Sequence, residues 1–81
     1  MARRTELDAW PAVAPEMLRA AREGAEMTIE GAAAAVRRRG RGLSERWLRK
    51  LETRVGVTAP RTLRALARVY GVQVASLRGE P

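Results

Sequence analysis

The chain contains neither cysteine nor histidine, which excludes disulfide bonds, thiolate nucleophiles and the usual zinc ligands. It therefore also lacks the side chain that most often acts as a general base near neutral pH. The nine acidic residues are dispersed among arginines, and none forms the pair in an apolar pocket that acid–base catalysis uses. We expect a protein that is not an enzyme and that holds no metal or cofactor.

Long apolar runs are missing too. The longest run, residues 32–36, is far shorter than the roughly 20 residues that a membrane-spanning helix needs. Near the N-terminus, Arg3 and Arg4 precede a partly apolar stretch, but Glu6 and Asp8 interrupt the hydrophobic segment that a secretory signal requires. We expect a cytoplasmic protein, associated with the nucleoid if it binds DNA, that makes no membrane contact.

Positive charge is abundant but unevenly placed. The 81-residue chain suits one small domain, and its residues 37–54 carry eight basic and two acidic side chains. The resulting +6 is most of the net charge of +7. A field of one sign focused on one segment attracts a polyanion through steering and counterion release. We interpret this segment as one that docks on DNA.

The first fourteen residues show neither helical nor strand periodicity, and Pro15 follows them. We therefore expect residues 1–14 to form an N-terminal arm and residues 15–81 to form the domain. Trp10 in this arm either packs onto the edge of the domain or contacts a partner from an exposed position.

Two helices are predicted before the basic segment. Pro15 suits the first turn of a helix, in which Met17, Leu18, Ala21 and Ala25 would lie on one side. Thr28 is a candidate N-cap for the next helix, which residues 37–39 would extend by a turn before two glycines end it. The apolar stripe of this second helix consists of Ile29, Ala32, Ala33 and Val36.

A third helix is predicted over residues 44–52, with Ser44 as its N-cap. Leu48 and Leu51 lie on one side of its helical wheel, and Arg46 and Arg49 lie on the other. The helix is therefore expected to pack through one face and to present arginines on the opposite face.

Two residues of this helix allow two interpretations each. Trp47 either packs at the edge of the core, which we favour, or offers a large apolar surface to a DNA sugar or a thymine methyl. Glu45 either pairs with Arg49 four positions later, which we also favour, or contacts a base.

A loop is expected over residues 53–59, followed by the most regular helix of the chain, residues 60–70. Gly71 is its expected C-cap. Val72, Val74 and Leu77 would face inward from a final helix of one or two turns, because an isolated strand would have nothing to pair with. The stripe of the 60–70 helix consists of Leu63, Leu66, Ala67 and Tyr70.

Three stretches in this order resemble the lambda-repressor-like (XRE-type) helix-turn-helix regulators. They are LRAARE followed by MT, then LSERWLRKLE, which looks like the family's recognition helix, and TLRALARVYGVQVASL, which looks like its TLxxLAxALGVSLDEL signature. The resemblance spans residues 17–78. It implies an all-α, compact five-helix domain whose third helix lies in the major groove.

The resemblance also assigns roles to residues. By position, the base contacts would come from Glu45, Arg46, Trp47 and Arg49, and arginine suits the two major-groove acceptors of guanine. Thr28 and Ser44, each at a helix N-terminus, would meet phosphates. We expect further phosphate contacts from the basic residues of the segment, which are Arg37, Arg38, Arg39, Arg41, Lys50 and Arg54.

The turn between the second and third helices departs from the family pattern, because residues 37–42 add roughly five residues to a turn of about three or four. Either these residues lengthen the second helix and clamp phosphates, or they form a flexible basic finger that enters the minor groove. We favour phosphate contact. A loop that contributes only diffuse charge is the third alternative.

The leading hypothesis is a sequence-specific regulator that binds double-stranded DNA, either a repressor or a phage- or plasmid-type control protein. The family implies a homodimer on a partly palindromic operator, paired in solution or only on the DNA, through the last helix, the arm or both. The alternatives are a small adaptor or antitoxin-like partner of RNA polymerase or of a toxin, and a non-specific nucleic-acid binder.

Overall fold

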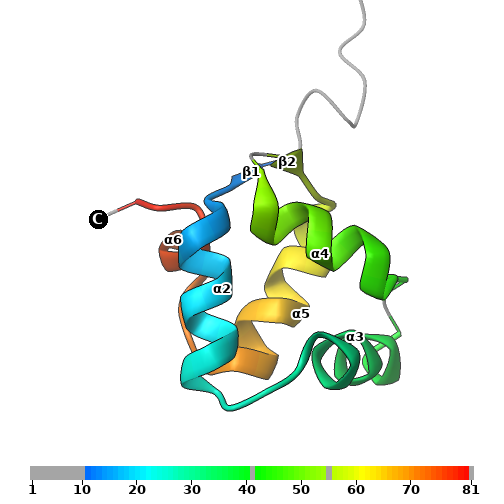
Figure 1. Ribbon diagram of the computed structural model, residues 1–81. Coiled ribbons are helices and arrows are strands. Elements are labelled where there is room, and N and C mark those ends of the chain that lie inside the picture. Colours follow the sequence, from blue (N-terminus) through cyan, green and yellow to red (C-terminus); the bar gives the residue numbers. More distant parts are fainter. Residues whose placement is uncertain (1–10, 41, 55, 81) are drawn as a thin grey trace, which may run out of the picture.

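The computed structural model describes residues 11–40, 42–54 and 56–80 (Figure 1). This part of the chain is mostly helical, with five helices, which agrees with the expected all-α class. It also contains one small sheet. The helices are α2 (Pro15–Gly24), α3 (Ile29–Arg38), α4 (Glu45–Thr53), α5 (Pro60–Tyr70) and α6 (Val74–Leu77), and the strands are β1 (Ala12–Val13) and β2 (Gly56–Val57).

The predicted helix ends are confirmed by their capping contacts. The Thr28 hydroxyl accepts a hydrogen bond from the Gly31 N–H at 2.9 Å, and the Ser44 hydroxyl accepts one from the Trp47 N–H at 3.0 Å. Gly71 adopts the left-handed conformation, with φ +70°, at the end of α5. Each cap satisfies backbone groups that the helix itself leaves unpaired.

The core surrounds α5, which lies in the middle of the other helices (Figure 1). Leu63 and Leu66 of α5 are fully buried, together with Leu18 of α2 and Val36 of α3. Met17 of α2 was also predicted to face inward, but that prediction was wrong, because its side chain is 42% exposed. Helix α2 packs on the core through Leu18, which is buried, and Ala21, which is half-buried.

A small antiparallel sheet joins two segments for which the sequence predicted no strand. Ala12 pairs with Val57, and Val13 pairs with Gly56. Val13 is 1% exposed and belongs to the core, and the Ala14 N–H donates to the Leu77 carbonyl at 2.9 Å. The end of the expected arm is therefore part of the domain. A strand of two residues is too short to show alternation, which explains why the sequence pattern missed it.

The rest of the expected arm, including Trp10, lies outside the described residues. None of the helices that the structure describes is long and apolar enough to cross a membrane.

The arginines that begin the basic segment at residue 37, which we call the basic run, extend α3 by two residues beyond Val36, to Arg38. Arg39 is the C-cap, and Gly40 follows with φ +80°, its N–H donating to the Arg37 carbonyl at 2.9 Å. A residue with a side chain would be strained at this φ, so Gly40 permits the reversal of the chain. The predicted helical extension is confirmed for Arg37 and Arg38 but does not include Arg39, whereas Arg41 lies outside the described residues.

Candidate nucleic-acid interface

Helix α4 has the two faces that the sequence predicted. Leu48 and Leu51 are 0% and 1% exposed and pack in the core, where α4 contacts α2 and α3. Arg46 and Arg49 are exposed on the other side. Arg46 forms no ion pair with any residue in the described ranges. Among the described residues, none occupies the five N–H donors of its guanidinium.

The N-terminus of α4 is exposed and capped. Ser44 uses a lone pair of its hydroxyl to accept the Trp47 N–H, which leaves the O–H of the same group free to donate to an anionic oxygen. Thr28 has the same arrangement at the N-terminus of α3. Both helix ends carry partial positive charge, so both predicted phosphate contacts lie where an anion is stabilised.

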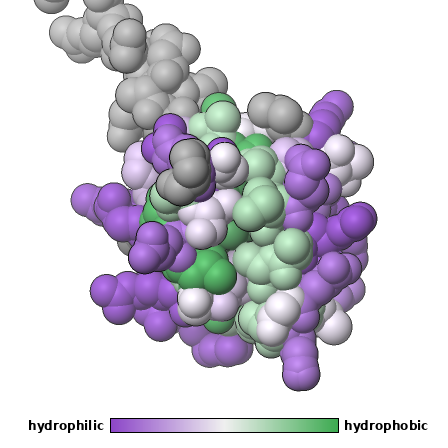
Figure 2. All heavy atoms as spheres, turned by 90° about the vertical axis from the view of Figure 1, so that its left-hand side faces the viewer, coloured by the Kyte–Doolittle hydropathy of each residue, from purple (hydrophilic) through white to green (hydrophobic). Residues whose placement is uncertain are grey.

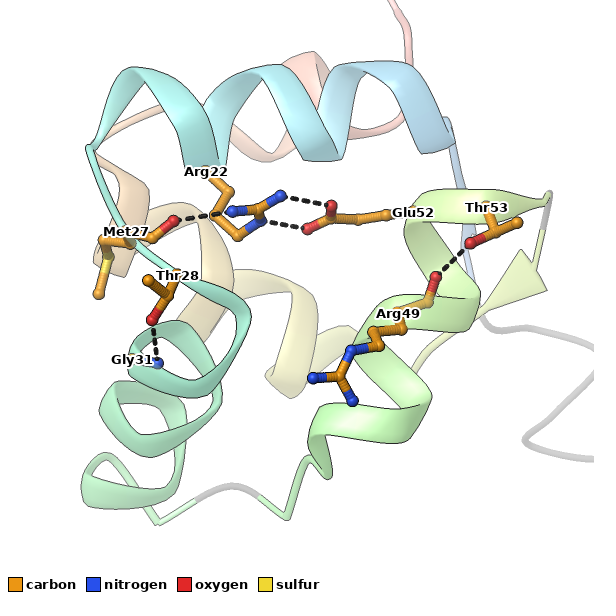
Figure 3. Close-up of polar contacts among 7 residues, drawn as sticks. All are labelled: Arg22, Met27, Thr28, Gly31, Arg49, Glu52 and Thr53. Atoms are coloured by element: carbon orange, nitrogen blue, oxygen red, sulfur yellow. Dashed lines mark hydrogen bonds and ion pairs between the residues drawn. The ribbon is translucent and has the colours of Figure 1, made fainter.

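Arg49 pairs with Glu30 across two helices and not with Glu45 along its own helix, so the predicted intrahelical pair was wrong. The Arg49 Nη2 lies 3.2 Å from a carboxylate oxygen of Glu30 at the start of α3. Figure 3 shows the Arg49 side chain extending from α4 toward α3. Both side chains are more than half exposed, at 56% and 62%. Such an exposed pair contributes little free energy, so Arg49 can exchange Glu30 for a ligand.

Trp47 keeps 41% of its surface exposed, so the structure does not bear out the favoured prediction that it packs mainly at the edge of the core. The ammonium of Lys50 lies 6.0 Å from the centre of its ring. Trp47 also lines an open hollow of about 300 Å³ between the starts of α4 and α5. We call this the hydroxyl hollow; its lining residues are Gly42, Leu43, Ser44, Trp47, Thr58, Ala59 and Thr62.

The basic run beside α4 is exposed at Arg37, Arg38 and Arg39. The Arg37 Nη1 donates to the Leu43 carbonyl at 3.4 Å, a contact that connects the end of α3 to the segment leading into α4. Arg54 is exposed just after α4. These predicted phosphate contacts therefore lie at both ends of α4, while Arg41 lies outside the described residues.

A partly buried ion pair that sequence reasoning missed joins α4 to α2. The Arg22 Nε and Nη2 donate to the two carboxylate oxygens of Glu52 at 2.8 and 3.0 Å (Figure 3). The remaining Nη1 donates to the Met27 carbonyl at 2.8 Å, in a turn where Glu26 has φ +57°. No spacing rule reveals this pair, because the partners are thirty positions apart.

Three arginines of α5 were also missed as candidate contacts. Arg61, Arg64 and Arg68 are exposed on one side of the helix. They lie outside the densest basic segment, which is why a count of charge passed over them. Their i, i+3, i+7 spacing is the signal that could have found them.

Comparisons of the chain with protein-family models, with curated proteins and with solved structures found no match.

Proposed function

We propose that the protein is a sequence-specific regulator that binds double-stranded DNA, with α3 and α4 as a helix-turn-helix of the lambda-repressor-like type. The observation that carries the proposal is the division of α4 into a fully buried leucine face and an exposed face with Arg46 and Arg49. A helix that is fixed on one side and offers exposed guanidinium groups on the other suits the major groove.

In this proposal the first turns of α4 read bases through Glu45, Arg46, Trp47 and Arg49. Arg46 is the main reader, because guanidinium bonds bidentately to guanine and because this side chain has no competing carboxylate within the described residues. Arg49 reads a base after leaving Glu30. Trp47 supplies apolar contact to a sugar or a thymine methyl.

The remaining contacts position the domain on the duplex. Thr28 and Ser44 donate to phosphates from capped helix ends, and the basic side chains at both ends of α4 contact the neighbouring phosphates. These contacts carry no sequence information, but they supply the salt-dependent part of the affinity. The residues proposed for this role are Thr28, Arg37, Arg38, Arg39, Arg41, Ser44, Lys50 and Arg54.

We further propose that two copies bind a partly palindromic operator, in the cytoplasm, with pairing completed in solution or on the DNA. Apolar residues run along the middle of the face that carries α2 and α6, with hydrophilic residues on both sides (Figure 2). Met17 of α2 and Val74 of α6 are apolar residues that keep solvent exposure. An apolar surface with a polar rim supports a protein–protein contact.

Selection from a library of random duplexes, followed by sequencing and by titration of a selected and a scrambled duplex, tests the proposal. We expect an enriched motif and tighter binding of the selected duplex at every salt concentration. Equal binding of both duplexes would leave a non-specific nucleic-acid binder. Absence of binding to any duplex would favour a protein-binding adaptor, because the charge would then serve an acidic protein surface.

A further inference from the structure

Four arginines line one open groove on the side of α5. Arg61, Arg64 and Arg68 project from α5, and Arg39 reaches the same groove from the end of α3. Ala65 completes the lining, and the groove has a volume of about 330 Å³. We call it the arginine groove. None of the expected DNA contacts except Arg39 belongs to it.

Within the described part of the chain, no carboxylate is paired with the positive charge of the groove. The ion pairs among the described residues join Arg22 to Glu52, Arg49 to Glu30 and Arg78 to Glu80, so they include none of the four lining arginines. Like charges gathered in one concave surface repel one another, and the potential that they create attracts an anion. The groove is therefore suited to an anionic ligand.

The shape and composition of the groove indicate which anion fits. The described residues of its lining include one small apolar side chain and no aromatic one, so they offer charge and hydrogen-bond donors but no platform for a base. From Arg61 to Arg68 the row of cations spans about 10 Å along the helix axis, from the rise per residue of an α-helix. A row of this length suits successive phosphates of a chain better than a single small ion.

The residues that line the arginine groove and those that line the hydroxyl hollow are close in the sequence at two places. Arg61 of the groove precedes Thr62 of the hollow on α5, and Arg39 of the groove leads into the segment that contains Gly42 and Leu43 of the hollow. Ser44 and Thr62 line the same hollow, so the start of α4 lies beside the start of α5, where the row of arginines begins. A backbone that passes the start of α4 can therefore reach these arginines.

We propose that the arginine groove binds the sugar-phosphate backbone of the same duplex that α4 reads, beyond the bases that α4 contacts. The inference rests on the proposed DNA-binding function and adds a second phosphate-binding surface to it. Its role is to extend the footprint and to raise affinity without reading sequence, because backbone contacts carry no base information.

The test compares Arg68→Gln with Arg19→Gln, each of which removes one positive charge from an exposed helix position. Arg19 lies on α2, outside the groove. Binding of the full-length variants to a selected duplex is measured over a range of salt. Arg68→Gln should make the negative slope of log affinity against log salt shallower by about one unit. The double variant Arg64→Gln with Arg68→Gln should make it shallower by about two units, whereas Arg19→Gln should leave it unchanged.

Neutral methylphosphonates placed one at a time along the duplex then locate the contact. At the phosphate that meets Arg68, the substitution should weaken the wild type and have no further effect on Arg68→Gln. Equal slopes for Arg68→Gln and Arg19→Gln, in a protein that binds duplex DNA, would overturn this inference alone. Binding of two duplexes per chain, with the second lost in Arg68→Gln, would overturn the same-duplex assignment. Failure of the wild type to bind any duplex would instead overturn the proposed function.

Discussion

Arg22 on α2 and Glu52 on α4 form a bidentate ion pair with N–O distances of 2.8 and 3.0 Å, and their side chains are only 15% and 6% exposed. The bond to Glu52 raises the pKa of the Arg22 guanidinium above its ordinary value, so Arg22 keeps its positive charge. Since Arg22 also binds the Met27 carbonyl, it connects α2, the turn that leads into α3, and α4. The direction of α4 depends on this connection.

Removing one partner of the pair should strongly destabilise the fold. We expect Glu52→Leu to lower the free energy of unfolding by about 1–3 kcal/mol, because it leaves the partly buried Arg22 charge without its carboxylate. The double variant Arg22→Met with Glu52→Leu should recover much of this loss, since no unpaired charge remains. Urea denaturation followed by circular dichroism measures both. A double variant that is as unstable as the sum of the single variants would contradict this account.

Tyr70 should make the protein sensitive to alkali. Burial raises the pKa of its phenol well above the ordinary value, and the nearby Glu52 carboxylate adds to the rise. The folded state therefore keeps a proton that the unfolded state loses above about pH 10, so stability is full below that pH and falls as the pH rises further. Tyr70 is the one tyrosine of the chain, so tyrosinate absorbance reports it directly. The absorbance should rise together with unfolding.

The variant Tyr70→Phe separates this effect from the general response to alkali. The buried Tyr70 hydroxyl has no hydrogen-bond partner among the described residues. Its removal should increase the free energy of unfolding by about 1 kcal/mol at pH 7, because an unsatisfied polar group leaves the interior. The variant should also lose less stability than the wild type above pH 10. If both proteins lost stability equally there, ionisation of Tyr70 would not be the cause.

The features that sequence could predict are those whose cause lies within a few residues. Ser44 and Gly71 were identified because a cap acts on backbone groups three or four positions away. The opposite faces of α4 followed from helical periodicity in the same way. Periodicity places Arg46 on the solvent side, but it says nothing about which partner that side meets.

The features that sequence missed depend on contacts between distant segments. The Arg22–Glu52 pair and the Arg49–Glu30 pair join different helices, and only the packing of those helices brings the partners together. The rule for charges four positions apart therefore gave Arg49 the wrong partner. The arginine groove has the same origin, since Arg39 and Arg68 come together through the packing of α3 against α5.

Two substitutions of Ser44 should separate its role in the fold from its role on DNA. Ser44→Ala removes the cap of α4 and should cost about 1 kcal/mol of stability. Ser44→Asp keeps a capping oxygen and should retain the stability, but its negative charge should repel a phosphate and weaken duplex binding. Thermal melts and binding titrations of the two variants provide the measurements. Full duplex affinity of Ser44→Asp would exclude a phosphate at this helix end.

Arg46 and Arg38 should affect DNA binding in different ways, because one reads a base and the other neutralises a phosphate. Arg46→Ala should cost about 1–3 kcal/mol on the selected duplex and relax the preference at one base pair. Arg38→Ala should weaken selected and scrambled duplexes alike and lower the salt slope by about one unit. Both side chains are exposed, so neither change should alter stability appreciably. An equal loss on both duplexes for Arg46→Ala would show that α4 is not the reading helix.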